Sequence, residues 1–289
     1  MQRRQFLLTP ALLAAKPAYA PTLSGAAYVF TQWLGREKRS LASGLDEIFG
    51  GFREAGYRQV EITSNLLAGE LAGRTAALLK QNGLQLPVVY QGGNIHDADA
   101  AGKTVDSMVE LANLVKPLGT KALVFNTAPK AQRGRKTDEE LARQREAMTQ
   151  MVKRVKATGL ALLLHQHAPE MSENSREWRE LLKVKGLGVC LDVHWILRGG
   201  QDVMALTREC GPRIGDMHLR NSHNGVWDEE LGDGDVDYRA VAAYLKQIGY
   251  RGYLSVELAW EAGTKLTRPL VESMRRSRVY AEEVFGVKA

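Results

Sequence analysis

The chain has 289 residues, of which 44% are hydrophobic and 25% are charged, a composition typical of soluble globular proteins. No segment approaches the roughly 18 consecutive apolar residues of a membrane span, which argues against stable membrane insertion. The net charge is +6, and Arg3, Arg4 and Lys16 near the N-terminus supply half of it, so the remainder lacks the concentrated basic patch of a nucleic-acid binder.

Residues 1–20 have the features of an export signal. An arginine pair at positions 3 and 4 precedes a short apolar run, and Ala18-Tyr19-Ala20 supplies a small-x-small cleavage pattern. The pair resembles the twin-arginine signal that carries folded proteins across the bacterial inner membrane. We therefore predict a signal peptide over residues 1–20, one mature domain over residues 21–289, and a periplasmic or otherwise exported location. The alternative is a basic first turn of a helix.

Downstream of this segment, short apolar runs alternate with segments of helical periodicity. Most of the runs are continuous stretches of Val, Leu and Ile, as in parallel strands covered by helices. Strands are predicted at Ala26–Phe30, Gln59–Thr63, Leu86–Gln91, Ala122–Asn126, Leu160–His165, Gly188–His194, Gly215–Leu219 and Tyr253–Leu258. Helical spacing is clearest in Leu41–Ala55, Thr104–Val115, Leu141–Ala157 and Arg239–Ile248.

Eight strand–helix repeats predict an α/β fold, namely a single-domain (β/α)8 TIM barrel. The competing architecture is a doubly wound open sheet, which usually carries a Gly-rich phosphate loop after its first strand. Here Thr31–Gly35 follows the first predicted strand and contains no such motif. The longest irregular stretch, His223–Asp237, follows the seventh strand, at the face where barrel enzymes carry their active-site loops.

Residues of metal-binding type lie at or near the ends of four consecutive predicted strands: His165, Asp192, His218 and Glu257. In a barrel these strand ends converge on one mouth. Imidazole and carboxylate groups there carry a desolvation cost unless they are paired or bound to a cation. We therefore predict one divalent metal ion held by all four, although each residue alone could be structural. Two imidazoles and two carboxylates favour Mn, Zn, Co or Fe over Mg.

Side-chain alternation adds neighbours to this set. His167, His194 and Arg220 each lie two positions after a predicted ligand and so point to the same side of an extended strand. Arg220 either binds a substrate carboxylate or phosphate, or neutralises Asp192 or Asp216.

Further lining of the mouth is predicted from strands two to four and from the loop after strand seven. Glu61, Tyr90 and Asn126 lie near the ends of those strands. Trp227 could stack on a sugar face, the alternative being ordinary core packing. The predicted substrate-binding residues are Glu61, Asn126, His194, Arg220 and Trp227.

Six short motifs follow one another along the chain: Gly56–Ile62, Cys190–Trp195, Asp216–Arg220, Gly232–Tyr238, Gly249–Tyr253 and Ser255–Leu258. In this order and spacing the chain resembles, from about Ala26 to its C-terminus, the xylose-isomerase-like superfamily of sugar isomerases and epimerases, which also contains the endonuclease IV type. The resemblance implies a bound Mn, Mg, Co or Zn ion held by a Glu, an Asp, a His and a second Glu. Asp192, His218 and Glu257 match the last three.

The fifth-strand ligand is where this sequence departs from the family. That position, usually Glu, is His165. In the family's epimerases the two glutamates also form the acid–base pair on opposite faces of the substrate carbon, so epimerisation by a Glu pair is in doubt here. His167 or Glu170 could supply a ligand or a base instead.

The expected activity is that of a metal-dependent isomerase, epimerase or lyase acting on a sugar or keto-sugar. A base removes a C–H proton and the ion stabilises the resulting enediolate. Glu257, His165 and His167 are the catalytic candidates. One alternative is a non-catalytic carbohydrate-binding or sensing barrel, and another is an endonuclease IV-like phosphodiesterase, which needs more ligands. The expected partner is a small sugar, no nucleic acid is expected, and a homo-oligomer is compatible with the sequence.

Overall fold

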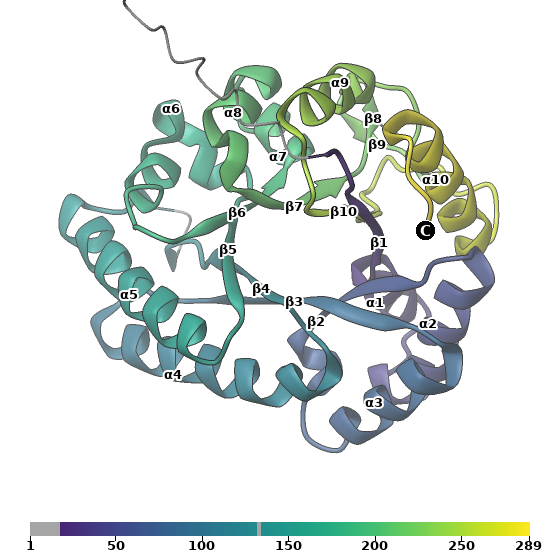
Figure 1. Ribbon diagram of the computed structural model, residues 1–289, viewed down its shortest axis with the longest axis horizontal. Helices are drawn as coiled ribbons and strands as arrows, with labels where there is room; N and C mark the ends of the chain where they lie inside the picture. Colours follow the sequence, from purple (N-terminus) through teal and green to yellow (C-terminus); the bar gives the residue numbers. More distant parts are fainter. Residues whose placement is uncertain (1–17, 132–133) are drawn as a thin grey trace, which may run out of the picture.

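The computed structural model describes residues 18–131 and 134–289, and it confirms the predicted (β/α)8 barrel (Figure 1). Within these residues eight parallel strands close in the order β1-β10-β7-β6-β5-β4-β3-β2. The barrel strands are β1 (Thr22–Ala26), β2 (Gln59–Thr63), β3 (Gln85–Gly93), β4 (Ala122–Thr127), β5 (Ala161–His165), β6 (Gly188–Asp192), β7 (Ile214–Leu219) and β10 (Tyr253–Val256). A separate antiparallel hairpin pairs β8 (Ser222–His223) with β9 (Val226–Trp227).

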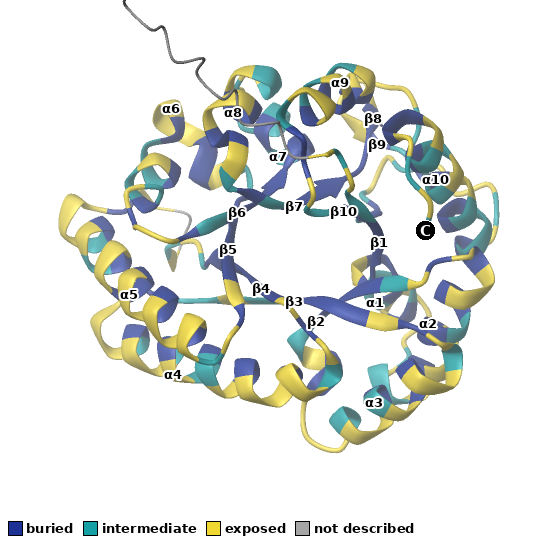
Figure 2. Ribbon diagram, viewed as in Figure 1, coloured by how far each residue is buried: buried dark blue, intermediate teal, exposed yellow. Residues whose placement is uncertain are grey.

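Helices form a ring around the barrel, with their exposed faces outward and their buried faces on the strands (Figure 2). They are α1 (Tyr28–Arg36), α2 (Leu41–Ala55), α3 (Leu71–Asn82), α4 (Ala98–Val115), α5 (Asp138–Ala157), α6 (Ala168–Leu181), α7 (Val193–Arg198), α8 (Val203–Cys210), α9 (Tyr238–Ile248) and α10 (Leu270–Phe285). Short 3-10 turns cover Ser64–Leu67, Lys116–Leu118 and Gly211–Arg213. The backbone of α6 is interrupted by non-helical residues over 172–175.

Helix α2 illustrates how the sequence sets each element. The Ser40 side chain accepts a hydrogen bond from the Ser43 N–H and begins the helix. Its apolar residues recur at helical spacing, and Ile48 and Phe52 are fully buried against the barrel. Gly56 ends the helix with a φ of +90°, a conformation that costs least for glycine. The predicted bounds of this helix are confirmed.

The apolar core has two parts. A large cluster lies between the strands and the surrounding helices. A small cluster fills the inside of the barrel and consists of Val88, Ala122, Val124, Leu163 and Cys190. Because this inner plug is packed, polar side chains carried further along the same strands lie above it, toward the mouth.

The first strand was predicted in the wrong place. The structure has β1 at Thr22–Ala26, whereas residues 28–30 of the predicted strand begin helix α1. The strand consists of small residues that give little hydrophobic signal, and Gly25 is needed because an added Cβ would lie 2.8 Å from the Phe52 ring. Val29 and Phe30, whose apolar character led to the strand prediction, are instead buried residues of helix α1.

The alternation argument for residues beyond the ligands does not hold, because each strand has ended before it reaches them. β5 and β7 end where predicted, and β6 ends two residues earlier than predicted. β5 ends at His165, and β6 ends at Asp192, so His167 caps helix α6 and His194 lies within helix α7. Arg220 follows the last residue of β7. The positions of these three side chains are therefore set by the turns after the strands and not by strand pleating.

The predicted signal peptide falls mostly outside the described residues. Of its cleavage motif, the Tyr19 hydroxyl donates to the Phe285 carbonyl at 2.8 Å, and the Ala20 N–H donates to the Tyr250 carbonyl at 3.0 Å. The boundary at residue 20 thus lies two residues before the first barrel strand. Among the described helices, none is both long enough and apolar enough to cross a membrane.

Candidate metal centre

The four predicted ligands meet at the carboxyl-terminal mouth of the barrel. Asp192, at the end of β6, lies opposite His218 of β7 in the strand register, and His165 ends the neighbouring strand β5. Glu257 follows the last residue of β10, and its backbone N–H donates to the Leu219 carbonyl at 3.0 Å. Their ligand-type atoms all lie within 4.8 Å of one another. The convergence on which the sequence prediction depends is present, and we call these four residues the upper layer.

Three ring nitrogens in the upper layer are buried without a hydrogen-bond partner among the described residues: both nitrogens of His165 and Nδ1 of His218. His165 Nε2 lies 3.6 Å from Asp192 Oδ2, and His218 Nδ1 lies 3.2 Å from Glu257 Oε2. An unsatisfied buried polar group costs about 1–3 kcal/mol. A cation between the rings and the carboxylates would satisfy one nitrogen of each ring and both acids. The donor set therefore fits a divalent metal ion.

The Arg220 guanidinium lies between two of these ligands. Its Nη2 donates to Asp192 Oδ2 and to Glu257 Oε2. Its Cζ lies 5.5 Å and 5.0 Å from the ring centres of Trp195 and Trp227, in cation–π contact with both. Of the roles left open by the sequence, the structure shows the ion pair with Asp192. Arg220 neutralises the same two carboxylates that a metal ion would use.

The charge states of Asp192, Glu257 and His165 suit a cation. Burial lowers the pKa of the fourth residue, His218, but the nearby Cys190, Glu61 and Glu257 outweigh burial and raise it, so this ring must lose a proton when it binds a metal ion. Burial would raise the pKa of Asp192 and of Glu257, but the Arg220 guanidinium and the neighbouring imidazoles together outweigh burial and hold both pKa values below their usual range. Burial lowers the pKa of His165, and it lowers the pKa of His167 to about 3. Charged carboxylates and neutral imidazoles are the forms that bind metals.

Local hydrogen bonds orient Asp192. Its Oδ1 accepts from the Trp195 N–H at 2.9 Å, which caps α7 and leaves Oδ2 for the cation. The Gln166 side chain donates to the Asp192 carbonyl at 2.7 Å and so ties the end of β5 to the end of β6. The sequence analysis missed Gln166. The available signal was an amide side chain between two histidines, directly after an apolar strand.

A second polar layer lies beneath the first, inside the barrel. This lower layer consists of Glu61, Cys190, Asp216 and Ser255, the last three of which precede an upper-layer residue by two positions in the sequence. His218 Nε2 lies 3.0 Å from Glu61 Oε1, so the His218 ring joins the two layers. Burial and the nearby Glu61 raise the pKa of Asp216 to about 8, and the Ser255 hydroxyl donates to it at 3.0 Å. Cys190 is a buried free thiol.

A cavity of about 250 Å³ opens above the upper layer. Of the predicted site residues it is lined by Glu61, His167, Arg220, Trp227 and Glu257. Tyr28 and Thr63 also line it, and the sequence analysis did not select them. Asn126 and His194 lie behind this lining instead of at the surface of the cavity.

His194 supports the mouth from behind. It is fully buried, with Nε2 at 2.8 Å from Ser222 Oγ and Nδ1 accepting from Trp227 Nε1 at 3.1 Å. The Ser222 hydroxyl in turn donates to Asp235 Oδ2 at 2.6 Å. Both ring nitrogens are therefore used in holding the loop after β7, which places the Trp227 indole beside the cavity.

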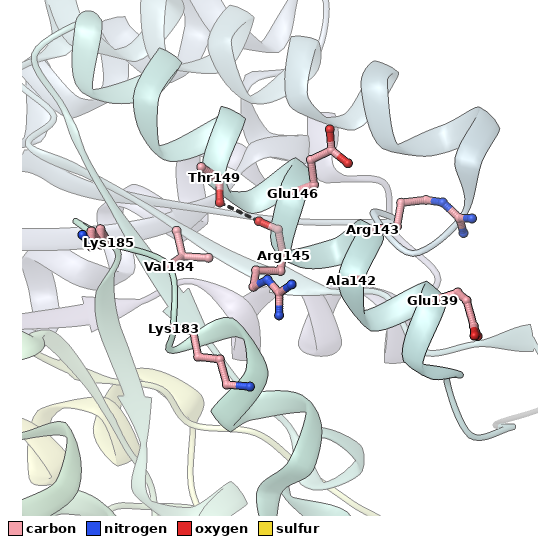
Figure 3. Close-up of a pocket in the computed structure, with 9 residues that line it drawn as sticks. All are labelled: Glu139, Ala142, Arg143, Arg145, Glu146, Thr149, Lys183, Val184 and Lys185. Carbon is pink, nitrogen blue, oxygen red and sulfur yellow. Dashed lines mark hydrogen bonds between the residues drawn. The ribbon is translucent and has the colours of Figure 1, made fainter.

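A larger groove of about 780 Å³ lies on the outside of the barrel, between α5 and the residues that follow α6 (Figure 3). Its charged side chains are Glu139, Arg143, Arg145, Glu146, Lys183 and Lys185. None of them is a histidine or cysteine, and the positive and negative charges are mixed. The upper-layer residues do not border this groove, so its size does not make it the reactive site.

Comparison with known proteins adds the family. The model of the xylose isomerase-like TIM barrel family matches residues 52–278. The chain belongs to this family. The match covers β2 to β10, and hence all four residues of the upper layer.

Curated relatives span much of this xylose isomerase-like chain. The rhizopine catabolism protein MocC of Rhizobium meliloti is 25% identical over 246 residues, which cover 74% of each chain. An L-ribulose 3-epimerase of Mesorhizobium japonicum is 24% identical over 75% of this chain and 76% of its own. An inosose dehydratase of Serratia proteamaculans is 23% identical over 64% and 72%. Relatives named as an epimerase and a dehydratase confirm the prediction that the chain is an enzyme.

Solved structures show the same fold. An L-ribulose 3-epimerase superposes with a TM-score of 0.73 at 19% identity, covering 92% of this chain and 95% of that one. A Methylomonas D-allulose 3-epimerase, solved in complex with D-allulose, superposes with a TM-score of 0.72 at 19% identity, covering 93% and 99%.

Proposed function

We propose that this protein is a metal-dependent isomerase, epimerase or lyase that removes a C–H proton from a sugar or keto-sugar. The observation that carries the proposal is the upper layer, in which two imidazoles with unpartnered nitrogens face two charged carboxylates at the base of a cavity. Relatives named L-ribulose 3-epimerase and inosose dehydratase support a sugar-like substrate and leave both reaction classes open.

His165, Asp192, His218 and Glu257 would hold the ion. When bound, a divalent ion supplies positive charge to substrate oxygens and so favours loss of a proton from the neighbouring carbon. Manganese, zinc, cobalt or iron suits two imidazoles and two carboxylates better than magnesium does.

The acid–base groups of this site are unequal. Glu257 borders the cavity as a carboxylate, whereas the place of the second family glutamate is taken by His165, whose ring is neutral and fully buried. A symmetric epimerase needs one group that removes a proton from one face of the carbon and an equivalent group that returns a proton to the opposite face. A carboxylate and an imidazole differ in basicity and reach, so the two groups here are not equivalent. This inequality favours a lyase or an aldose–ketose isomerase over a symmetric epimerase.

Arg220 and the tryptophans would bind the substrate. The Arg220 guanidinium and the Trp195 and Trp227 rings form one wall of the cavity. Once an ion neutralises the two carboxylates, the guanidinium donors are free to bind substrate hydroxyl or carbonyl oxygens. The aromatic rings would exclude water from the reacting carbon and contact the apolar face of a sugar ring.

Proton exchange tests the proposal directly. Protein loaded with Mn²⁺, Co²⁺ or Zn²⁺ is incubated in D₂O with pentuloses, hexuloses and keto-inositols. We expect carbon-bound deuterium in at least one compound, with an isomerised or dehydrated product identified by NMR and mass spectrometry. The Asp192→Ala variant should give neither. A metal-loaded protein that binds a sugar without exchange or product would instead support a carbohydrate-binding barrel.

We also propose that residues 1–20 direct export through the twin-arginine route. The arginine pair and the Ala18-Tyr19-Ala20 motif carry this proposal. In a bacterial host, the wild-type chain should be recovered from the periplasm with Pro21 at its N-terminus. Replacing Arg3 and Arg4 by Lys should retain it in the cytoplasm, and equal periplasmic recovery of both forms would contradict the proposal.

A further inference from the structure

His167 lies at the edge of the cavity, at the N-cap of helix α6. Its backbone N–H donates to Glu170 Oε2 at 2.9 Å, and its ring packs edge-on against Trp195 at a centroid distance of 5.3 Å. Its Nδ1 lies 3.2 Å from Asn126 Nδ2. No hydrogen bond joins Nε2 to any described residue, so Nε2 is the nitrogen left for a ligand.

The hydrogen bonds of the neighbouring groups determine which ring nitrogen of His167 carries the hydrogen. The Thr127 carbonyl oxygen can only accept, and it lies 3.2 Å from Asn126 Nδ2, which must therefore be the amide NH₂. The other amide atom, Oδ1, accepts from the Tyr90 hydroxyl at 2.6 Å. The NH₂ also faces His167 Nδ1, so Nδ1 presents a lone pair. A neutral ring with a lone pair on Nδ1 carries its hydrogen on Nε2.

The backbone around Asn126 leaves little room for a different arrangement. A Cβ added at Gly92 would lie 2.5 Å from Asn126 Oδ1, so glycine allows the amide to sit between Tyr90 and His167. Gly92 and Asn126 are also register partners on β3 and β4. The amide is thus held by two strands and two side-chain contacts.

We infer that His167 acts as a hydrogen-bond donor, through Nε2–H, to a carbonyl or hydroxyl oxygen of a polyhydroxylated substrate, and that it is not the general base. This inference rests on the proposed function for the substrate class, whereas the ring tautomer rests on the geometry alone. It corrects the hypothesis that His167 removes the proton, and it leaves Glu257 and His165 for that role. A fixed donor in a partly buried site stabilises charge that develops on a substrate oxygen.

Nitrogen NMR tests the tautomer without any need for activity. The full-length protein is labelled with ¹⁵N-histidine and loaded with diamagnetic Zn²⁺, and the His167 signals are assigned by their loss in His167→Gln. We expect Nε2 to be protonated and Nδ1 unprotonated from pH 6 to pH 8. In Asn126→Asp the carboxylate should draw the hydrogen to Nδ1. A proton on Nδ1 in the wild type, or an even mixture of tautomers, would overturn the inference.

Kinetics separate a donor from a base. The amide introduced by His167→Gln can still donate, so we expect kcat of that variant within about tenfold of wild type, whereas His167→Leu should lower kcat by about 10²–10³-fold. Both variants should keep the wild-type pH profile. Equal loss in both variants, with disappearance of the ionisation on the acidic limb of the pH profile, would show that His167 is the base. If the wild type converts no sugar, the proposed function fails while the tautomer result still stands.

Discussion

The two polar layers inside the barrel contain similar groups but differ in what they leave unsatisfied. The lower layer has Glu61 and Asp216 as its acids. Ser255 donates to Asp216 Oδ1 and His218 Nε2 contacts Glu61, which leaves a carboxylate oxygen, Asp216 Oδ2, without a described partner but no ring nitrogen. In the upper layer, two carboxylates share Arg220, while nitrogens of His165 and His218 have no described partner.

Each layer has one carboxylate at the cavity. Glu257 of the upper layer and Glu61 of the lower layer border it, whereas Cys190, Asp216 and Ser255 are fully buried beneath it. A cluster of acids, a thiol and an imidazole is therefore no sign of reactivity by itself. What distinguishes the upper layer is the combination of unpartnered ring nitrogens with charged carboxylates. The lower layer supports it by fixing the His218 ring.

The largest effect is expected from breaking the upper layer. His218→Ala and Asp192→Ala each remove a ligand from a buried site, so bound metal should fall from about one ion per chain to a small fraction. Elemental analysis after purification in metal-replete buffer measures this. His223→Ala is the matched control, because His223 is exposed and pairs only with Asp228. Full metal occupancy in His218→Ala would show that the upper layer is not the metal site.

Arg220→Met tests whether the Arg220 guanidinium and a metal ion compete for the two carboxylates of the upper layer. Without the guanidinium, Asp192 and Glu257 lose their partner, and breaking a buried ion pair costs about 3–5 kcal/mol. We expect the metal-free variant to melt well below the wild type, and metal binding to become at least tenfold tighter because no side chain must be displaced. Thermal unfolding and calorimetric titration measure the two effects. Unchanged metal affinity would show that Arg220 and the ion do not share these carboxylates.

Glu61→Gln tests whether the lower layer acts through His218. Glutamine keeps an acceptor for His218 Nε2 but removes the charge, and losing such an outer partner typically weakens metal binding by about 10–100-fold. The effect should be smaller than that of His218→Ala and should appear in metal affinity even without substrate. Ser255→Ala is the matched control, since the Ser255 hydroxyl donates to Asp216 and makes no hydrogen bond to the His218 ring among the described residues. Equal affinities in Glu61→Gln and the wild type would argue that the two layers are independent.

The last prediction concerns stability and not metal binding, at Glu170 beside the mouth. Burial raises the pKa of Glu170 to about 7, above the 4.5 of a free side chain, so its contribution to stability is fully present below pH 4.5 and is lost as pH rises toward 7. The full difference is on the order of 3 kcal/mol at most. Glu170→Gln should therefore gain stability relative to the wild type between pH 5 and pH 8. If the melting temperatures of Glu170→Gln and the wild type differ by the same amount at every pH in this range, the raised pKa of Glu170 is contradicted.

Much of the fold could be predicted from sequence because most barrel strands are continuous apolar runs. β1 could not, since its small residues pack against Phe52 and Tyr57 without a hydrophobic pattern of their own. The upper layer could be predicted because strand ends converge wherever a barrel closes. The turns after β5 and β6 could not. Helix α7 begins directly after β6 and places His194 behind the cavity, whereas α6 begins after a two-residue turn that places His167 at the cavity edge.

The role of Asn126 shows a further limit of sequence reasoning. The sequence analysis placed it at a strand end as a substrate-binding residue. The structure gives it Tyr90, Thr127 and His167 as partners, which depend on β3, β4 and β5 lying side by side. Hydrogen-bond direction depends on all these partners together, and no single segment of sequence contains them.

A crystal structure of metal-loaded protein, with anomalous scattering recorded at the absorption edge of the bound metal, tests the central claim most directly. We predict one anomalous peak within coordination distance of His165, Asp192, His218 Nδ1 and Glu257, with the Arg220 guanidinium displaced from the two carboxylates. A metal-replete crystal with no peak at this mouth, or with the ion bound elsewhere while Arg220 stays between Asp192 and Glu257, would contradict the account.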